Sequence, residues 1–385
     1  MSLAVCVVTG SRADYGLLQP VMAALAADPA FALRIVATGM HCSPEFGLTY
    51  REIEADGFRI DEKVEMLLSS DTRIGAAKAM GLGAIGCADA LGRLAPDLVM
   101  LLGDRFEALA AASAAHLLGL PVAHLSGGDL TEGAFDDAIR HAITKLSHLH
   151  FVASEDSARR VRQLGEPADR VHRVGDPGLD HLKGFAPPPR EAVEQALGFR
   201  FRRRNFLVTF HPVTNDARPS AEQLDALLAA LEALGDEAGL VITKPNADPE
   251  GRALIERLEA FAARQDNVSL HTSLGRRRYF GVMAHVDAVV GNSSSGLLEA
   301  PSLGKPTVNI GRRQERRLRA RSVIDCPAET AAILAAIERA LALDCRKVEN
   351  PYGDGEAAPR ILAVLKSIGE PKRLLAKRFV DLPAA

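Results

Sequence analysis

The stretch LAVCVVTGSRADYG, residues 3–16, decides the fold of the first half of the chain. Its residues from Leu3 to Thr9 are apolar or β-branched, and Gly10 and a polar turn follow them. This order is typical of a buried strand that leads into a helix, and the amphipathic segment Leu17–Ala27 continues the pattern. Such a strand–helix unit predicts a parallel sheet covered by helices on both faces.

The same alternation of strand and helix repeats along the chain on both sides of residue 184. Further strands are predicted at Leu33–Thr38, Leu98–Leu102, Val122–Leu125, His150–Ala153, Phe206–Phe210, Leu240–Thr243, Val268–His271, Val286–Val290 and Thr307–Ile310. Helices are predicted at Phe106–Leu118, Ser220–Leu234, Pro249–Ala263, Gly275–Ala284 and Glu329–Leu343, and another in the tail from Ala358. Ser220 and Gln223 have the spacing of a capping box. The pattern therefore predicts an α/β protein with two Rossmann-like, doubly wound domains.

A break in the alternation marks the domain boundary. The segment Asp180–Arg190 contains three consecutive prolines, Pro187–Pro189, which favour an extended and semi-rigid connector. We expect an N-terminal domain at 1–183 and a C-terminal domain at 184–365, with a C-terminal helix at 366–385 that joins the first domain. Ligands of doubly wound sheets bind beyond the carboxyl ends of the strands, so we expect a cleft between the two domains.

The composition excludes several classes of protein. The chain has 46 Lys and Arg against 49 Asp and Glu, a net charge of −3, whereas nucleic-acid binders are usually basic. The sequence shows no apolar run of the ~18–20 residues that span a bilayer, and its first residues make a poor signal peptide. The five cysteines lack the paired spacing of a zinc site. We expect a cytoplasmic protein that binds neither membranes nor a metal.

Polar side chains directly after the predicted strands are the candidates for a functional site in the first half. Asp104 follows a fully apolar strand and can cap the next helix as well as act as an acid. Asp129 and Asp136 belong to a run of four carboxylates within nine residues, and such crowding raises a pKa and suits acid–base chemistry. The alternative is a solvated acidic helix start. Arg12 and His41 follow the first two strands, where they can reach a ligand.

The second half carries groups that suit a phosphorylated ligand. His211 ends its first strand and can donate to a phosphate or a sugar hydroxyl. The turn with Ser293 and Ser294 offers hydroxyls and backbone N–H groups for a phosphate, although it lacks the Gly-Lys-Ser/Thr of a nucleotide-hydrolysing loop. Glu299 can accept hydrogen bonds from ribose hydroxyls. One or two arginines of the run at 312–321 can clamp a pyrophosphate.

Six motifs in order resemble one family, the hydrolysing UDP-N-acetylglucosamine 2-epimerases of bacterial sialic and legionaminic acid pathways. The motifs are TGSRADYG at 9–16, TGMHC at 38–42, LGDRFE at 102–107, GGDLTEGAFDDAIRHAITKLSHLHF at 127–151, TFHPVT at 209–214 and GNSSSGLLEAPSLGKPTVNIGRRQ at 291–314. The resemblance covers nearly the whole chain. It implies a GT-B-like fold in which the second domain holds most of the nucleotide.

The resemblance also implies the reaction. The enzyme removes the proton at carbon 2, expels the nucleoside diphosphate from carbon 1 to leave a glycal, and adds water to give the 2-epimeric free sugar, with no cofactor. The substrate is UDP-N-acetylglucosamine, or UDP- or GDP-2,4-diacetamido-2,4,6-trideoxyglucose, and the product is N-acetylmannosamine or its diacetamido analogue. Family members are commonly homodimers or homotetramers. The alternatives are a non-hydrolysing 2-epimerase, a GT-B glycosyltransferase and a non-catalytic sugar-nucleotide binder.

The resemblance assigns roles to individual residues. Asp104 and Asp136 match catalytic carboxylates, and His211 matches the histidine at the strand end of the second domain. Asp129 is expected to be the third acid, since Ser126 before it cannot serve as a carboxylate base. The residues expected to hold the substrate and its nucleotide are Arg12, His41, Ser293, Ser294, Glu299, Arg313 and Arg317.

Overall fold

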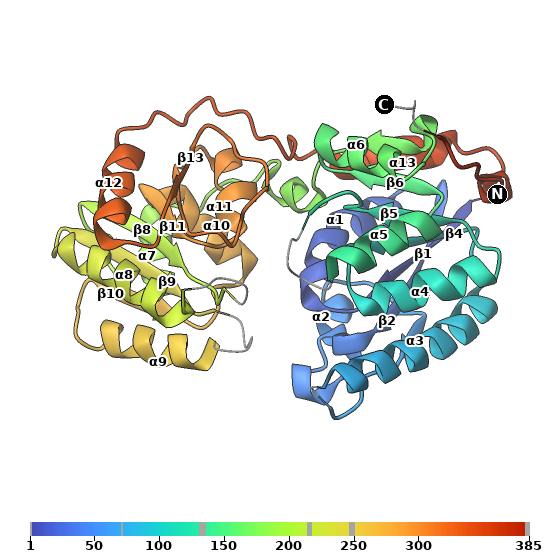
Figure 1. Cartoon of the computed structure of the whole chain (residues 1–385), viewed down its shortest axis with the longest axis horizontal. Helices are drawn as coiled ribbons and strands as arrows, with labels where there is room; N and C mark the ends of the chain where they lie inside the picture. Colours follow the sequence, from blue (N-terminus) through green and yellow to red (C-terminus); the bar gives the residue numbers. More distant parts are fainter. Residues whose placement is uncertain (1, 71, 131–135, 214–217, 246–250, 382–385) are drawn as a thin grey trace. The chain divides into compact units, whose positions relative to one another are not determined.

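The computed structural model describes residues 2–70, 72–130, 136–213, 218–245 and 251–381. The chain divides into two compact units, and each contains its own parallel sheet (Figure 1). The first unit is formed by Met1–Lys183 together with Tyr352–Ala385, and the second by Gly184–Pro351. The predicted α/β class with two doubly wound domains is confirmed.

The sheet of the first unit has seven strands in the order β3-β2-β1-β4-β5-β6-β7, and all neighbours are parallel. The strands are β1 (Leu3–Thr9), β2 (Phe31–Thr38), β3 (Glu62–Val64), β4 (Leu98–Leu102), β5 (Val122–Leu125), β6 (Leu149–Val152) and β7 (Val171–Arg173). The order of the strands reverses between β1 and β4. Sheets of this kind bind their ligands beyond the carboxyl ends of the strands beside such a reversal.

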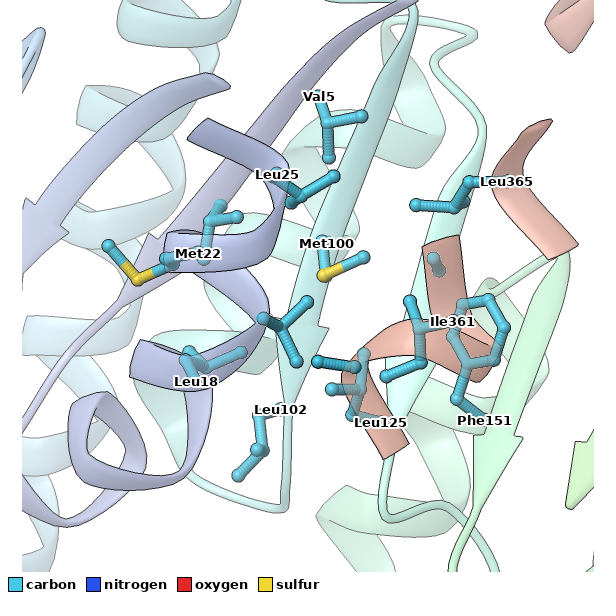
Figure 2. Close-up of a cluster of buried hydrophobic side chains, with 14 of the residues drawn as sticks. Val5, Leu18, Met22, Leu25, Met100, Leu102, Leu125, Phe151, Ile361 and Leu365 are labelled. Atoms are coloured by element: carbon cyan, nitrogen blue, oxygen red, sulfur yellow. The ribbon is translucent and has the colours of Figure 1, made fainter. Parts of the chain in front are cut away.

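Helices cover both faces of this sheet. They are α1 (Arg12–Ala27), α2 (Tyr50–Ala55), α3 (Arg73–Leu94), α4 (Phe106–Leu117), α5 (Asp136–Leu146), α6 (Glu155–Gln163) and α13 (Ala357–Ser367), with short 3₁₀ helices η1 (Gly39–Cys42), η2 (Pro44–Phe46), η3 (Ala168–Arg170), η4 (Pro177–Leu182) and η6 (Pro371–Leu375). On one face α1 and α13 pack on the strands, and Leu18 and Ile361 meet Met100 in that core (Figure 2). On the other face α3, α4 and α5 contribute a second apolar cluster.

The second unit repeats the same topology with six parallel strands in the order β10-β9-β8-β11-β12-β13. The strands are β8 (Arg204–Thr209), β9 (Ala238–Thr243), β10 (Val268–His271), β11 (Ala288–Gly291), β12 (Thr307–Ile310) and β13 (Val323–Cys326). The helices are α7 (Arg190–Leu197), α8 (Ser220–Ala233), α9 (Gly251–Ala262), α10 (Gly275–His285), α11 (Ser295–Leu298) and α12 (Thr330–Leu341), with the 3₁₀ helix η5 (Pro301–Leu303). Its switch point lies between β8 and β11.

The chain returns to the first unit at Tyr352, earlier than the residue 366 expected from the sequence. The carboxylate of Asp180 accepts hydrogen bonds from the backbone N–H groups of Ala357 (2.9 Å) and Ala358 (2.6 Å) at the start of α13. The apolar face of α13, with Leu365, is buried in the core of the first unit (Figure 2). This capping and burial fix the whole of α13 to the first unit.

Helix α3 was not assigned in the sequence analysis, because glycines weaken the helical pattern of segment 73–94. Two of these glycines are required by packing. A Cβ atom at Gly83 would lie 2.7 Å from Cε of Met66, and one at Gly86 would lie 2.5 Å from Cγ1 of Val64. Among the described residues, α3 is the one helix long and apolar enough to cross a membrane. Helices that pack on a sheet pass the same test, and α3 packs against α4 and β3.

The capping box predicted at Ser220 and Gln223 is wrong. Pro219 is the N-cap residue of α8, and no side chain caps the helix there. The Ser220 hydroxyl accepts from the backbone N–H of Val213 (2.9 Å), and the Gln223 amide donates to the Arg218 carbonyl (2.9 Å). Both side chains therefore bind backbone groups of residues that precede the helix, Val213 and Arg218.

Candidate active site

Asp104 lies at the switch point of the first unit, directly after β4. Gly103 precedes it with φ of +83°, a conformation that favours glycine, and its N–H donates to the Leu125 carbonyl (3.0 Å). The Nε2 atom of His124 lies 2.8 Å from the Gly103 carbonyl and its Nδ1 atom 3.2 Å from the Thr144 hydroxyl. Because His124 is fully buried, its pKa is lowered to about 3, so the neutral ring donates to the carbonyl. These contacts fix the turn that presents Asp104.

The carboxylate of Asp104 forms an ion pair with Arg140 of α5. Arg140 is 6% exposed, and it also donates to the carbonyl of Ser126 (3.0 Å). Ser126 has φ of +61°, so the strand end of β5 is held in an unusual conformation beside this arginine. The Asp104 side chain keeps 22% of its surface exposed, so it remains accessible to a ligand.

Asp136, the first residue of α5, lies close to Asp104. Burial raises the pKa of Asp136, and the negative charge of Asp104 raises it further, while Arg105 opposes the shift. The structure thus brings two of the predicted catalytic carboxylates together beside Arg140. A carboxyl group with a raised pKa is suited to proton transfer near neutral pH.

Asp129 has a different neighbourhood. Its carboxylate accepts a hydrogen bond from the Ser157 hydroxyl (2.7 Å) in the first turn of α6. The backbone at Gly128 has φ of +75°, and a Cβ atom there would lie 2.3 Å from the Ser157 carbonyl oxygen. The loop is therefore packed tightly on α6. Residues 131–135 lie outside the described residues, and they include Glu132, one of the four carboxylates within residues 129–137.

Arg12 and His41 have opposite exposures. The Arg12 guanidinium is largely exposed and forms an ion pair with Glu52 (3.4 Å). His41 is fully buried, and its ring nitrogens lie 3.1 Å from the Thr9 hydroxyl and 2.8 Å from the Thr49 hydroxyl. We expected His41 to reach a ligand, but the structure buries its ring. Two hydroxyls occupy the ring, so it ties the loop after β2 to the end of β1.

Glu107 is a charged residue that the sequence analysis quoted within LGDRFE without selecting it. It is 2% exposed and pairs with Arg105 (3.0 Å). A Cβ atom at Gly10 would lie 3.1 Å from Cβ of Glu107, and one at Gly39 would lie 2.8 Å from its Cγ. The loops after β1 and β2 therefore pack on the Glu107 side chain. Gly10 and Gly39 in the motifs were the one sequence feature that could have indicated this packing.

In the second unit, the ends of β8 and β11 are tied together at the switch point. The Asn292 side chain accepts from the His211 backbone N–H (2.7 Å) and donates to its carbonyl (2.8 Å). Gly291 has φ of +136°, and a Cβ atom there would lie 2.0 Å from the Thr209 carbonyl oxygen. Burial lowers the pKa of His211 to about 4, with help from the charge of Arg313, so the ring is neutral. The structure thus fixes His211 beside the serine turn.

The serine turn continues from Asn292 into α11. Ser293 and Ser294 are half-buried, and the Ser293 hydroxyl accepts from the N–H of Ser295 (3.4 Å). The Arg313 guanidinium donates to the Asn292 carbonyl (3.1 Å), which holds a cation against the turn. Arg317 is half-buried on the loop that follows β12. The turn is therefore linked through Asn292 both to the backbone of His211 and to Arg313.

Glu299 follows α11 and is directed into the second unit. Its Oε2 atom is buried and has no hydrogen-bond partner among the described residues. Burial raises the pKa of Glu299, and burial also raises the pKa of Tyr279 nearby on α10. The Glu299 carboxyl group is thus available to a polar ligand, and Tyr279 is a neighbour that the sequence analysis missed, because nothing in its pattern marked it.

The buried histidines of the first unit predict acid sensitivity. Burial lowers the pKa of His124 to about 3 and that of His148 to about 4. Unfolding releases these rings to their ordinary pKa of about 6.5, so the unfolded state binds more protons below that pH. We expect stability to fall as the pH decreases from about 6.5 to 4, by about 2 kcal/mol per ring at pH 5. Urea unfolding at pH 7.5 and pH 5 measures this loss, and equal midpoints would contradict it.

Comparisons with known proteins identify the family of the chain. The family profile described as UDP-N-acetylglucosamine 2-epimerase matches residues 23–366. The chain is 40% identical over 322 residues to the hydrolysing GDP/UDP-N,N'-diacetylbacillosamine 2-epimerase of Campylobacter jejuni subsp. jejuni serotype O:2, covering 83% of each chain. It is 37% identical over 370 residues to the hydrolysing UDP-N,N'-diacetylbacillosamine 2-epimerase of Legionella pneumophila subsp. pneumophila, covering 96% of this chain and 97% of that one.

The structural comparison supports the same assignment of the fold. The crystal structure of the UDP-GlcNAc 2-epimerase of Neisseria meningitidis bound to UDP-GlcNAc aligns with a TM-score of 0.72 and 21% identity over 95% of this chain and all of that one. The predicted GT-B-like fold is confirmed. The motifs that suggested the family in the sequence thus agree with the family profile, the relatives and the fold, and the chain belongs to the UDP-N-acetylglucosamine 2-epimerase family.

Proposed function

We propose that this member of the family is a hydrolysing sugar-nucleotide 2-epimerase. The proposal is based on the side chains that lie at the switch points of the two sheets. The first holds Asp104 and Asp136 beside Arg140, and the second holds the serine turn with Arg313 against it. Proton transfer and the binding of a diphosphate are the two requirements of the reaction. The relatives named as hydrolysing 2-epimerases support the same reading.

The first half of the proposed reaction is an elimination. A base takes the proton from carbon 2 while the bond from carbon 1 to the phosphate oxygen breaks, and the nucleoside diphosphate leaves with the bonding electrons. Asp104 stabilises the oxocarbenium character of carbon 1. Ser293, Ser294 and the arginines Arg313 and Arg317 stabilise the negative charge that develops on the diphosphate. A double bond between carbons 1 and 2 remains in the glycal.

The second half is a hydration that inverts carbon 2. Water adds its hydroxyl group to carbon 1, and a proton adds to carbon 2 from the face opposite to the one deprotonated. One base and one acid are therefore required, and Asp136 with its raised pKa suits one of these roles. We propose Asp129 as the further acid and His211 as a neutral hydrogen-bonding group for the sugar or phosphate.

The remaining predicted residues hold the nucleotide in this proposal. Arg12 is exposed and pairs with Glu52, and we propose that its guanidinium also binds the substrate. Glu299 offers ribose hydroxyls its Oε2 atom, which has no hydrogen-bond partner in the part of the chain that the structure describes. His41 supports the site through the loop that it fixes, since both of its ring nitrogens are occupied.

The proposal also covers the nucleotide, the oligomeric state, the cellular compartment and the use of the product. The nucleotide is UDP or GDP, the enzyme is a cytoplasmic homodimer or homotetramer, and the free sugar serves the biosynthesis of sialic or legionaminic acid. The names of the relatives support a sugar nucleotide of this kind.

The test is to incubate the protein with three substrates side by side: UDP-N-acetylglucosamine and UDP- or GDP-2,4-diacetamido-2,4,6-trideoxyglucose. We expect one or more of them to give free nucleoside diphosphate and free 2-epimeric sugar. Because the carbon 2 proton is replaced from solvent, a reaction in D₂O should place deuterium at carbon 2 of the product, and NMR measures both the sugar and the label.

Other products would contradict the proposal and identify an alternative. A 2-epimer that stays attached to its nucleotide would indicate the non-hydrolysing reaction. Nucleotide release that requires an acceptor sugar, without deuterium at carbon 2, would indicate a glycosyltransferase. Binding of all three substrates without turnover would indicate a sugar-nucleotide binder.

A further inference from the structure

A hollow of about 240 Å³ lies in the second unit between α7 and α10, two helices that pack against each other. Its third wall is Pro188, in the connector that precedes α7. Sites for drug-sized ligands usually measure about 300–1,000 Å³, so this hollow suits a smaller molecule. None of the described residues that line it belongs to the candidate active site.

Small residues keep the groove between the two helices open. Ala192 and Ala196 lie one turn apart on α7, and both are exposed. On α10, a Cβ atom at Gly281 would lie 3.4 Å from Cδ of Pro188 and 3.5 Å from Cγ2 of Val193, which are ordinary contacts. Alanine would therefore fit there, and a helix favours alanine over glycine. Packing does not require this glycine, and its missing side chain leaves room in the hollow.

The walls of the hollow are fixed before any ligand arrives. The His285 ring at the end of α10 donates to the Pro188 carbonyl (2.6 Å from Nε2), which holds the connector against the helix. The ring of Phe185 meets that of Phe280 edge to face, with 5.8 Å between the centroids. Val193 is buried in the apolar cluster beneath α7 and α10. A preformed apolar hollow binds a ligand without the cost of ordering its own walls.

The charges at the edge of the hollow suit an anion. Arg277 and Arg278 line it and are exposed, and neither side chain forms an ion pair or hydrogen bond within the part of the chain that the structure describes. The described lining contains no acidic residue. Glu194 on α7 is already occupied, because it pairs with Arg190 (3.1 Å) and accepts from the Phe201 N–H (3.0 Å). A guanidinium group binds a carboxylate through two parallel hydrogen bonds.

We propose that the hollow between α7 and α10 binds a small carboxylic acid with an apolar body, such as an aryl or short alkyl acid. The apolar body fills the groove between Ala196 and Gly281, and the carboxylate pairs with Arg277 and Arg278 at its edge. Free phosphate lacks the apolar body, and a neutral hydrocarbon lacks a group for the arginines. This site is separate from the one proposed for the sugar nucleotide.

The test is to titrate the full chain with hydrocinnamate and with its neutral amide, followed by saturation-transfer NMR and calorimetry. We expect a Kd of about 1 mM for the acid, as for other ligands of this size. The amide should bind at least about threefold more weakly, because it loses the charge opposite the arginines. Saturating UDP should leave the Kd of hydrocinnamate unchanged. Equal binding of acid and amide, or displacement of the acid by UDP, would overturn the inference.

A matched pair of variants tests the position of the apolar body. Ala196 lines the hollow, whereas the adjacent Gln195 is exposed on the same helix and does not line it. Ala196→Phe places a ring in the groove and should raise the Kd of hydrocinnamate at least about fivefold. Gln195→Phe adds the same ring outside the hollow and should leave the Kd within about twofold. An unchanged Kd in Ala196→Phe would place the probe elsewhere and overturn the inference.

A variant of the two arginines keeps the test decisive if Ala196→Phe does not fold. Arg277→Gln combined with Arg278→Gln should weaken hydrocinnamate to the level of the amide and leave the amide unchanged. Arg264→Gln removes another exposed arginine of the second unit and is the control, with a Kd within about twofold of the wild type. Equal losses in both arginine variants, or no saturable binding to the wild type up to about 10 mM, would overturn the inference. Neither result would affect the proposed function, which turnover of the sugar nucleotides tests.

Discussion

Replacing Asp104 by asparagine should lower kcat for nucleoside diphosphate release about a thousandfold. Asparagine keeps the size of the side chain and one acceptor oxygen for Arg140, but it removes the negative charge opposite carbon 1. The positive charge of Arg140 would then be unopposed where oxocarbenium character develops. Initial rates with saturating substrate measure the effect, while KM should change little, because the lost interaction is strongest in the transition state.

Asp97→Asn is the matched control for this prediction. Asp97 and Asp104 flank the same strand, β4, and Asp97 stands at its amino end, where its carboxylate accepts from the Ala4 N–H (2.8 Å). An asparagine can keep that hydrogen bond, so we expect activity within about twofold of the wild type. A loss of activity shared by both variants would point to a general loss of structure, and full activity of Asp104→Asn would exclude Asp104 from the chemistry.

The sequence predicted the central strands well and the edges of the sheets poorly. Strands such as β4 and β12 are short apolar runs buried on both faces, which is the pattern of a parallel sheet, and their predicted bounds match the structure. The edge strands β3 and β13 carry charged residues and were not predicted, since one side of an edge strand has no partner to bury it. The helix α3 was missed because its glycines serve contacts with Met66 and Val64 that only the folded chain reveals.

The strand pattern locates those candidate site residues that directly follow a strand. It does not reveal contacts that form only when separate loops pack together. Asp104, His211 and the serine turn lie at the carboxyl ends of β4, β8 and β11, which the strand pattern alone locates. The burial of His41 arises from loops that meet in space, so no local pattern announces it. The burial of Glu107 also depends on such loops, and Gly10 and Gly39 are its one signal in the motifs.

The raised pKa of Asp136 has opposite consequences for stability and for catalysis. A carboxyl group whose pKa is higher in the folded state binds more protons when folded, so its contribution to stability falls as the pH rises through its ordinary and raised pKa values. At neutral pH the ionised Asp136 therefore destabilises the fold, because it is half-buried and close to Asp104. If the same ionised group serves as the base, activity must be lost as the pH falls through the raised pKa, above the usual range of aspartate.

Asp136→Asn should therefore separate the two properties. We expect kcat to fall about 10²- to 10⁴-fold, because the proton at carbon 2 loses its base or acid, while the urea midpoint at pH 7 stays equal to the wild type or increases. The neighbouring Asp137→Asn is the control; its carboxylate faces His141 on the same helix (3.6 Å), and activity should stay within about threefold. A wild-type rate in Asp136→Asn would remove Asp136 from the mechanism. A lower urea midpoint would show instead that the ionised carboxylate stabilises the fold, against the raised pKa on which its role in proton transfer depends.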